Sequence, residues 1–174
     1  RRVREQNVYC EVKPCSISPA EIEKIAPIGI ILSGGPQSVY ESVSPHVDPA
    51  LFALGIPVLG ICYGCQLMAY SLGGTVAAAT EATAREYGKT LTEFDTDCSI
   101  FQGLPASSVT WMSHGDYISQ VPDGFAVTAK TAVCPTAAMA CPEKKLYGVQ
   151  FHPEVQHTVE GSEMLRRFLY TVCG

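Results

Sequence analysis

The chain has 174 residues, of which 47% are hydrophobic and 17% are charged. This length suits one domain with a buried core, and the high apolar content with few charges excludes a disordered chain. Seventeen acidic and twelve basic residues give a net charge of −5, and because the lysines and arginines are scattered we expect no nucleic-acid binding.

The first half of the chain alternates between strand-like and helix-like segments. Residues 1–5 resemble the middle of a helix and contain no Met, so we expect residues upstream to be missing. Strands are predicted at three short stretches and helices at three segments with recognisable starts or ends. Such alternation implies crossover connections, and therefore a parallel sheet with helices on both faces. The strands are 8–12, 29–32 and 57–61; the helices run from the capping box Ser18-Pro19-Ala20-Glu21 to before Pro27, from Asp48-Pro49 to about Leu54, and from Gly64 to Leu72, closed by Gly73-Gly74.

An uncharged stretch from Pro49 to Thr80 could suggest a membrane span, which needs about 20 predominantly apolar residues. Pro57 and several glycines interrupt it, and Gln66 lies in its middle. Helix breakers at this density favour a buried strand followed by a buried helix, so we expect no membrane association.

The second half of the chain is richer in predicted strands, which are joined by Pro, Gly and Asp turns. Some of them are expected to form an antiparallel extension, and a final amphipathic helix is predicted over residues 160–173. No linker or internal repeat divides the chain. We therefore predict a single α/β domain over residues 1–174, with a mostly parallel central sheet, helices on both faces and a small antiparallel extension. The strands are expected at 85–94, 109–112, 125–131, 136–140 and 145–150.

Cys62 is the strongest candidate for a nucleophile. An apolar strand leads directly into it, a helix follows at once, and Gly60 and Gly64 lie two residues to either side. This is the pattern of a nucleophile elbow, with Cys in place of Ser. The start of the following helix favours negative charge, and it leaves the Tyr63 N–H free to face a developing oxyanion. A buried structural cysteine is the alternative interpretation.

Cys62 and Cys65 also form a C-x-x-C pair, which could indicate a redox or zinc site. A second ligand pair at matching spacing is missing among the eight cysteines, and the glycines flank Cys62 alone, so we assign Cys65 to helix packing. The chain is long for a disulfide scaffold and shows no secretory signal, which favours free thiols and a cytoplasmic location.

A thiol nucleophile usually needs a base, and His152 is the best candidate among the four histidines. It follows a predicted strand in the run His152-Pro153-Glu154, so that Glu154 could hold the imidazole in one tautomer. The alternative is an exposed loop histidine beside an exposed glutamate.

Three motifs in this order resemble the class I glutamine amidotransferase family, whose fold is flavodoxin-like. They are Ser33-Gly34-Gly35-Pro36, Gly60-Ile61-Cys62-Tyr63-Gly64-Cys65-Gln66 and Gln150-Phe151-His152-Pro153-Glu154. The family begins with a strand and a glycine-containing loop before the helix that residues 1–5 would occupy, so this chain is expected to lack its first strand.

The resemblance implies a role for each matching residue. Cys62 would attack the side-chain amide of glutamine, His152 would activate water against the resulting thioester, and Glu154 would orient His152. The N–H groups of Gly35 and Tyr63 would form the oxyanion hole. Gly34, Gln66, Ser113 and Asp116 would bind glutamine, with the Asp116 carboxylate on its ammonium group. A plain tight turn at Gly34-Gly35 and a turn aspartate at Asp116 are the alternatives.

Two further stretches, Arg85-Glu86-Tyr87-Gly88 and Trp111-Met112-Ser113-His114-Gly115-Asp116, resemble the GMP synthase branch of the family. This implies that the chain supplies ammonia for ATP-dependent amination of XMP to GMP by an ATP pyrophosphatase (synthetase) domain or subunit. Nothing in the sequence resembles a phosphate-cradling loop, so ATP and Mg²⁺ are expected only in that partner, with no cofactor or metal in this domain. The alternatives are the glutaminase part of anthranilate, carbamoyl phosphate or CTP synthase, another α/β cysteine hydrolase, and a non-catalytic domain.

Overall fold

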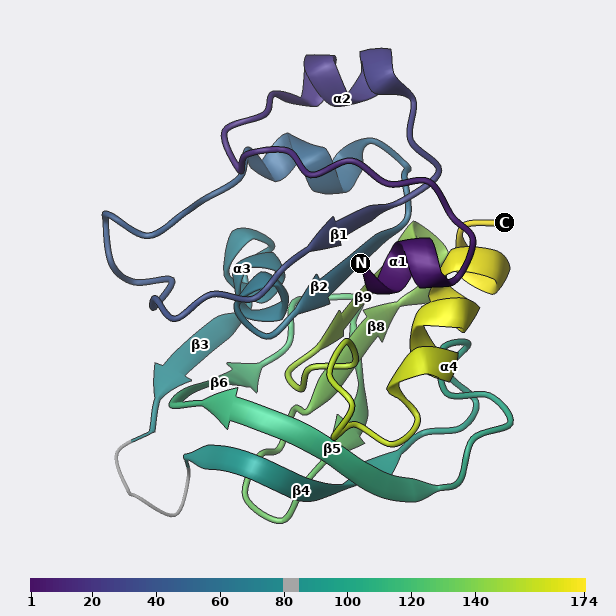
Figure 1. Ribbon diagram of the computed structural model, residues 1–174. Coiled ribbons are helices and arrows are strands. Elements are labelled where there is room, and N and C mark those ends of the chain that lie inside the picture. The colour runs from purple at the N-terminus through teal and green to yellow at the C-terminus, as the bar shows by residue number, and fades with distance from the viewer. Residues whose placement is uncertain (80–84) are drawn as a thin grey trace.

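The computed structural model describes residues 1–79 and 85–174, and its centre is a curled seven-stranded sheet (Figure 1). At one side of the sheet, β1 (Ile30–Leu32), β2 (Val58–Ile61) and β9 (Leu146–Val149) run parallel to one another. The sheet then continues through antiparallel pairs. These join β9 to β8 (Ala138–Cys141), β7 (Ala126–Lys130), β4 (Glu86–Phe94) and β5 (Ser107–His114) in that order. A separate antiparallel pair contains β3 (Thr75–Ala78) and β6 (Asp116–Gln120).

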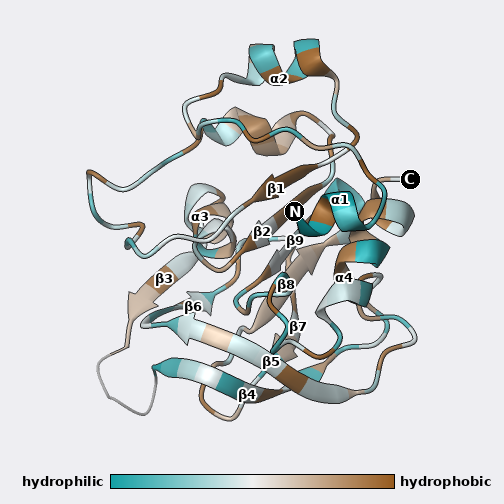
Figure 2. Ribbon diagram, viewed as in Figure 1, coloured by the Kyte–Doolittle hydropathy of each residue, from teal (hydrophilic) through white to brown (hydrophobic). Residues whose placement is uncertain are grey.

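Helices cover both faces of the parallel part of the sheet. Successive residues of a strand point to opposite faces, so each strand packs against helices on both sides. On β2, Val58 packs in one apolar cluster with residues of α3, whereas Leu59 and Ile61 pack in another with residues of the C-terminal helix. Figure 2 shows the apolar residues gathered on the inner strands. The expected α/β fold is thus confirmed, and its antiparallel part is larger than the small extension expected, since four of the six strand pairs in the main sheet are antiparallel. The helices are α1 (Arg2–Glu5), α2 (Pro19–Ile25), α3 (Tyr63–Ser71) and α4 (Gly161–Arg167), with 3₁₀ turns at Pro49–Ala53 and Pro142–Lys144 and a π-helical turn at Phe168–Val172.

The uncharged stretch forms buried elements, as expected. All four residues of β2 and seven of the nine residues of α3 are buried. Among the described residues, none of the helices has the length and apolar character that crossing a membrane requires.

Local signals place most elements correctly, and the misses have physical reasons. The capping box is confirmed, since the Ser18 side chain accepts a hydrogen bond from the Glu21 N–H. The strand expected at residues 8–12 is wrong: β1 pairs only with β2 in the described part of the chain, and Tyr9 and Val12 are exposed. Local pattern does not predict strands β3 and β6, because each depends on pairing with the other.

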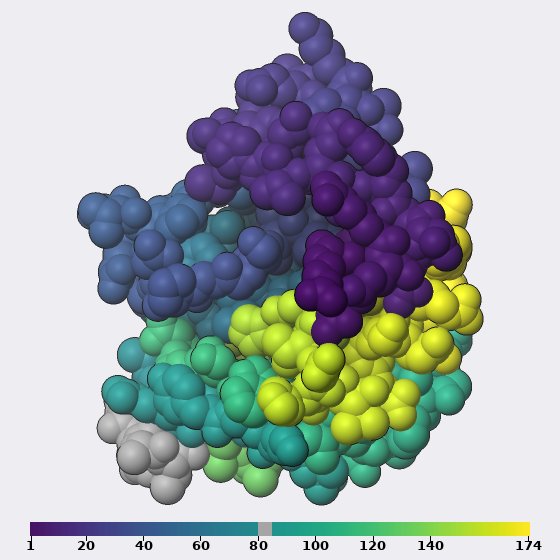
Figure 3. All heavy atoms as spheres, viewed as in Figure 1, coloured from purple at the N-terminus to yellow at the C-terminus, as the bar shows by residue number. Residues whose placement is uncertain are grey.

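The N-terminal segment lies against the C-terminal part of the chain, as the space-filling view shows (Figure 3). Arg2 donates from Nε to the carbonyl oxygen of Glu154 at 2.7 Å, and Gln6 donates to Ser162. This contact brings α1 next to the loop that carries His152 and Glu154.

Candidate active site

Cys62 occupies a sharp turn between β2 and α3. Its backbone has φ 53° and ψ −109°, a combination that residues with a side chain rarely adopt. Such strain costs about 1–3 kcal/mol and persists where the surroundings hold the backbone in place. Here the Cys62 N–H donates to the Val149 carbonyl at 2.8 Å, and the Cys62 carbonyl accepts hydrogen bonds from two N–H groups in the first turn of α3. The elbow expected from the glycine spacing is present.

Close backbone contacts explain the two glycines of the elbow. A Cβ atom on Gly60 would lie 2.6 Å from the carbonyl oxygen of Gly64, and a Cβ atom on Gly64 would lie 2.2 Å from the carbonyl oxygen of Leu32. Backbone atoms cannot turn aside as the end of a flexible side chain can. Any larger residue at either position would therefore separate β1, β2 and α3 at the point where Cys62 lies.

His152 and Glu154 lie beside Cys62, because β9 is the parallel neighbour of β2 and both strands end at the same edge. A Cβ atom on Gly34 would lie 3.1 Å from Cε1 of His152 and 3.4 Å from Cβ of Cys62, so both side chains border the same point beside Gly34. Nδ1 of His152 is 2.6 Å from a carboxylate oxygen of Glu154. The three residues chosen from the sequence are thus brought together.

The neighbours of His152 favour its charged form. The Cys62 side chain, and after it the Glu154 carboxylate, raise the pKa of His152 to about 10, although partial burial acts in the opposite direction. The site thus holds a protonated imidazole next to a sulfur atom over the neutral pH range. A positive charge in this position stabilises a thiolate.

The two residues expected to form the oxyanion hole are neighbours. A Cβ atom on Gly35 would lie 4.0 Å from Cγ of Tyr63. Tyr63 is the first residue of α3, so its N–H has no acceptor within the helix and points out of the helix N-terminus. Both residues therefore lie at the edge of the sheet where Cys62 is found.

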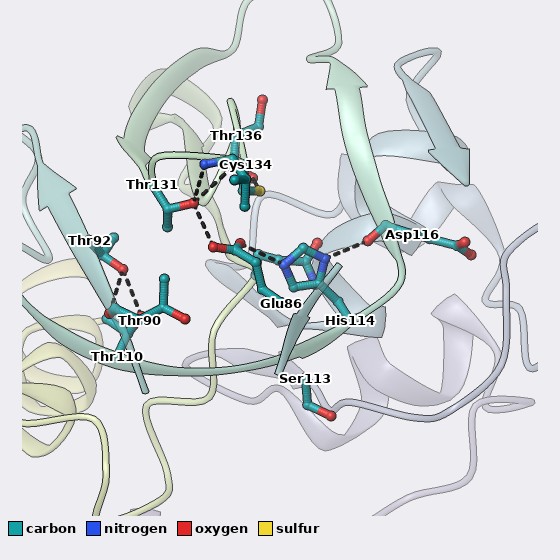
Figure 4. A network of polar contacts seen from close by, with 12 residues as sticks. Glu86, Thr90, Thr92, Thr110, Ser113, His114, Asp116, Thr131, Cys134 and Thr136 are labelled. Atoms are coloured by element: carbon teal, nitrogen blue, oxygen red, sulfur yellow. Dashed lines mark hydrogen bonds and ion pairs between the residues drawn. The ribbon is translucent and has the colours of Figure 1, made fainter. Parts of the chain in front are cut away.

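Gln66 contacts protein groups rather than open space. Its side chain is only 4% exposed, and its amide nitrogen donates to the Asp116 carbonyl at 3.0 Å and to the Gln150 side-chain oxygen at 3.1 Å. The Ser113 carbonyl lies 3.7 Å from the Cys62 sulfur. The Asp116 carboxylate points away from the His114 ring (Figure 4). The structure thus brings Gln66, Ser113 and Asp116 together around the site, and their glutamine-binding roles stay predictions.

Sequence reasoning assigned no role to Gln150, although it lies inside one of the three motifs. Its side chain is fully buried and its amide nitrogen donates to the Cys62 sulfur at 3.6 Å. A polar residue at the end of an apolar strand is the signal that could have marked it, since buried amides nearly always have a specific partner.

The cysteine pair C-x-x-C does not form a bond, and all eight cysteines are free. Cys65 is fully buried, and a Cβ atom on Gly148 would lie only 2.5 Å from its sulfur. Burial raises the pKa of the Cys65 thiol. Cys65 therefore packs α3 against β9, as its assignment to helix packing predicted.

One group of potential metal ligands occurs in the described residues. Ligand atoms of Glu86, His114 and Cys134 lie within 4.8 Å of one another, and all three residues are buried. This donor set would suit zinc. Each group nevertheless has a protein partner already: His114 contacts Glu86 at 3.0 Å, Glu86 accepts from Thr131 at 2.7 Å, and the Cys134 thiol donates to the Thr136 carbonyl at 3.4 Å (Figure 4).

Comparison with known proteins identifies the class of protein to which this fold and site correspond. The sequence profile of the glutamine amidotransferase class-I family matches residues 1–172, and the chain belongs to that family. A solved protein of Thermoplasma acidophilum, described as one of the subunits of a GMP synthase, is 31% identical with a TM-score of 0.84, over 99% of this chain and 84% of that one. A glutamine amidotransferase of Thermotoga maritima shares the fold at 22% identity, with a TM-score of 0.66 over 82% of this chain and 77% of that one.

Curated relatives are more similar in sequence. The GMP synthase [glutamine-hydrolyzing] of Clostridium botulinum (strain Alaska E43 / Type E3) is 55% identical over all 174 residues of this chain. That of Caldanaerobacter subterraneus subsp. tengcongensis is 56% identical over 99% of the chain. The chain spans about a third of the length of these relatives, 33% in both cases.

Proposed function

We propose that the chain is the glutamine-hydrolysing part of a GMP synthase. It releases ammonia from glutamine, and a synthetase domain or subunit uses this ammonia for the ATP-dependent amination of XMP to GMP. The observation that carries the proposal is the strained Cys62 at the end of β2 with His152 and Glu154 aligned beside it. The names and identity of the curated relatives support the choice of branch.

The first half of the reaction forms a thioester. The Cys62 sulfur attacks the side-chain carbonyl carbon of glutamine, and the carbonyl oxygen becomes an oxyanion that the N–H groups of Gly35 and Tyr63 stabilise. Loss of one donor of this kind typically lowers turnover by about 10²–10³-fold. The tetrahedral intermediate collapses, the carbon–nitrogen bond breaks, and the His152 imidazolium gives its proton to the departing ammonia.

The second half returns the free enzyme. Neutral His152 takes a proton from a water molecule, which attacks the thioester and forms glutamate. The carbon–sulfur bond breaks and the sulfur regains its original state. Glu154 accepts a hydrogen bond from Nδ1 of His152, so Nε2 is the atom that exchanges protons with substrate and water.

The amino-acid end of glutamine needs groups that recognise an ammonium and a carboxylate. The Asp116 carboxylate is the candidate for the ammonium, while Gly34, Gln66 and Ser113 shape the site around it. Cys62 is only 5% exposed, so glutamine reaches the sulfur through a local opening of the segments around it. A synthetase partner that favours this opening would couple glutamine hydrolysis to the acceptor reaction.

The remaining two-thirds of the curated relatives' length leaves room for the synthetase part. We place ATP and Mg²⁺ there and no cofactor in this domain. Eight free cysteines agree with the reducing cytoplasm that we propose as its location.

The direct test is glutamine hydrolysis by the chain and its Cys62→Ala variant. We expect glutamate and ammonia from the parent and none above background from the variant, with unchanged circular dichroism in both. Unchanged turnover in the variant would eliminate the mechanism.

A second experiment tests the branch. An ATP-dependent synthetase partner, XMP and glutamine are added to the chain, and GMP is measured. GMP formation that depends on Cys62 is expected. Transfer to a different acceptor, with no GMP, would assign the chain to another synthase.

A further inference from the structure

We propose that Gln150 is a further catalytic residue, which donates a hydrogen bond to the Cys62 sulfur and is held in this orientation by a buried polar chain that ends at Glu86. The proposal rests on the proposed role of Cys62 as nucleophile. Gln150 is fully buried, and its amide nitrogen lies 3.6 Å from the sulfur. Hydrogen bonds to sulfur are longer than those to oxygen, so the distance of 3.6 Å corresponds to a hydrogen bond.

The chain of contacts is continuous from the sulfur to strand β4. The Gln150 side-chain oxygen accepts from Gln66 at 3.1 Å, and the Gln66 nitrogen also donates to the Asp116 carbonyl at 3.0 Å. The same carbonyl meets Nδ1 of His114 at 2.9 Å, and Nε2 of His114 meets Glu86 at 3.0 Å. The two glutamines, His114 and Glu86 are each at most 6% exposed.

The Asp116 carbonyl fixes the direction of every hydrogen bond on the way to the sulfur. A backbone carbonyl can only accept, so the NH₂ group of Gln66 must face it, and the same NH₂ group reaches the Gln150 oxygen. The NH₂ group of Gln150 must then face Cys62. An amide flip at either glutamine would leave two acceptors or two donors opposed in a buried site, which costs about 1–3 kcal/mol for an unpaired group.

The far end of the chain is anchored in the same way. His114 donates from Nδ1 to the Asp116 carbonyl, which can only accept, and its Nε2 contacts a carboxylate oxygen of Glu86. The other Glu86 oxygen accepts from Thr131 (Figure 4). His114 and Glu86 are therefore positioning residues that act on the sulfur through Asp116 and the two glutamines.

The donor from Gln150 favours one charge state of the sulfur. A thiol can donate to the Ser113 carbonyl at 3.7 Å, whereas a thiolate would face that carbonyl as a second acceptor. A thiolate instead accepts from Gln150 and stands beside the His152 imidazolium. Hydrogen bonds to a charged group are about twice as strong as those between neutral groups. Gln150 thus shifts the sulfur toward its reactive form.

The test is the pH dependence of Cys62 alkylation by iodoacetamide, which needs no glutamine and therefore no glutaminase activity. The rate at Cys62 is followed by peptide mass spectrometry from about pH 5 to pH 10. In Gln150→Met, which keeps the length and burial of the side chain but removes the donor, we expect the midpoint of the profile to rise by about one pH unit and kcat for glutamine to fall about tenfold, with little change in KM.

Thr92→Val is the matched control. Thr92 is a fully buried residue whose hydroxyl contacts that of Thr110 at 2.7 Å elsewhere on β4, away from the polar chain that leads to the sulfur. The Thr92→Val variant loses a buried hydrogen bond, as Gln150→Met does, yet the midpoint of its Cys62 alkylation profile should equal that of the parent chain. If Gln150→Met does not fold, Gln66→Met serves instead, and we expect a rise of the same sign that is smaller.

The outcomes separate the two proposals. An unchanged midpoint in a folded Gln150→Met variant would overturn the role of Gln150, whatever its glutaminase activity. An equal rise in Thr92→Val would also overturn it, because the shift would then follow from general loosening. Glutaminase activity that survives in Cys62→Ala would instead overturn the proposed function and leave the alkylation result intact.

Discussion

The elbow around Cys62 and the polar chain behind it act on the same sulfur by different physical means. The elbow is a steric device: Gly60 and Gly64 let three backbone segments meet at distances that no side chain could enter, and this sets where the sulfur lies. The polar chain is directional: four hydrogen bonds starting from one carbonyl determine which atoms face the sulfur.

We infer from this difference that the position and the charge state of the sulfur are controlled separately. A change in the elbow moves the nucleophile and weakens the sheet together, since both depend on the same backbone contacts. A change in the polar chain, or in His152, leaves the sulfur in place and alters how readily it becomes a thiolate. The two regions should therefore respond differently to mutation.

The largest effect on activity is expected at His152, whose charge acts directly on the sulfur and the substrate. Replacing His152 by Gln should lower kcat for glutamine hydrolysis by about 10²–10⁴-fold, because proton transfer to ammonia and from water is lost. Glutamate formation at saturating glutamine measures it. His157→Gln is the matched control. This exposed histidine lies in the same loop, and its ring stacks on that of Trp111 with the two ring centroids 4.6 Å apart. Equal loss in both variants would show that the loop fold matters rather than the imidazole.

A steric change in the elbow should have the next largest effect on activity. Gly64→Ala forces a Cβ atom to 2.2 Å from the Leu32 carbonyl, so we expect a stability loss of about 3 kcal/mol. Activity should also fall by about 100-fold or more, since a displacement near 1 Å of a reacting group costs this much. Urea unfolding and glutaminase assays measure the two effects.

Gly115→Ala is the stability control, because its Cβ atom would meet nothing closer than 3.6 Å. It should cost less than about 1 kcal/mol. A Gly64→Ala variant as stable as the parent would show that the elbow is not sterically determined.

A further prediction concerns how the stability of the chain changes with pH. The raised pKa of His152, about 10 against about 6.5 in the unfolded chain, means that the folded state binds this proton more tightly. The resulting stabilisation is complete below about pH 6.5 and is lost as pH rises to about 10.

The measurement is the difference in unfolding free energy between the parent and His152→Gln at about pH 6, 8 and 10. This difference cancels the titration of the groups that do not interact with His152, and it should shrink as pH rises. A constant or growing difference would mean that the folded chain does not favour the imidazolium.

The same contrast explains what the sequence could predict. The elbow is visible locally, since two glycines flank a cysteine between a strand and a helix, and the alternation of elements places β2 and α3 correctly. His152 and Glu154 could be found because they follow a second apolar strand. The contacts of the polar chain could not be predicted, because no local pattern marks them. They join residues far apart in the sequence, 88 residues from Gln150 to Cys62 and 50 from Gln66 to Asp116.

Contacts of this kind depend on strand order, which alternation does not specify. Two features belong to the assembled fold and to no local pattern. Strand β9 lies between β2 and β8, and β6 pairs with β3 in a separate sheet. The incorrect strand at residues 8–12 has the same origin, since a strand needs a neighbour as well as a suitable pattern.

The central claim is that Cys62 is a nucleophile specific for glutamine. It is tested most directly by treating the chain with a diazoketone analogue of glutamine and locating the modified residues by mass spectrometry. We expect one equivalent on Cys62, protection by glutamine, and no reaction at the other seven cysteines, Cys65 included, whose buried thiol has a raised pKa. Modification spread over several cysteines, or a Cys62 that does not react while the chain hydrolyses glutamine, would contradict the account.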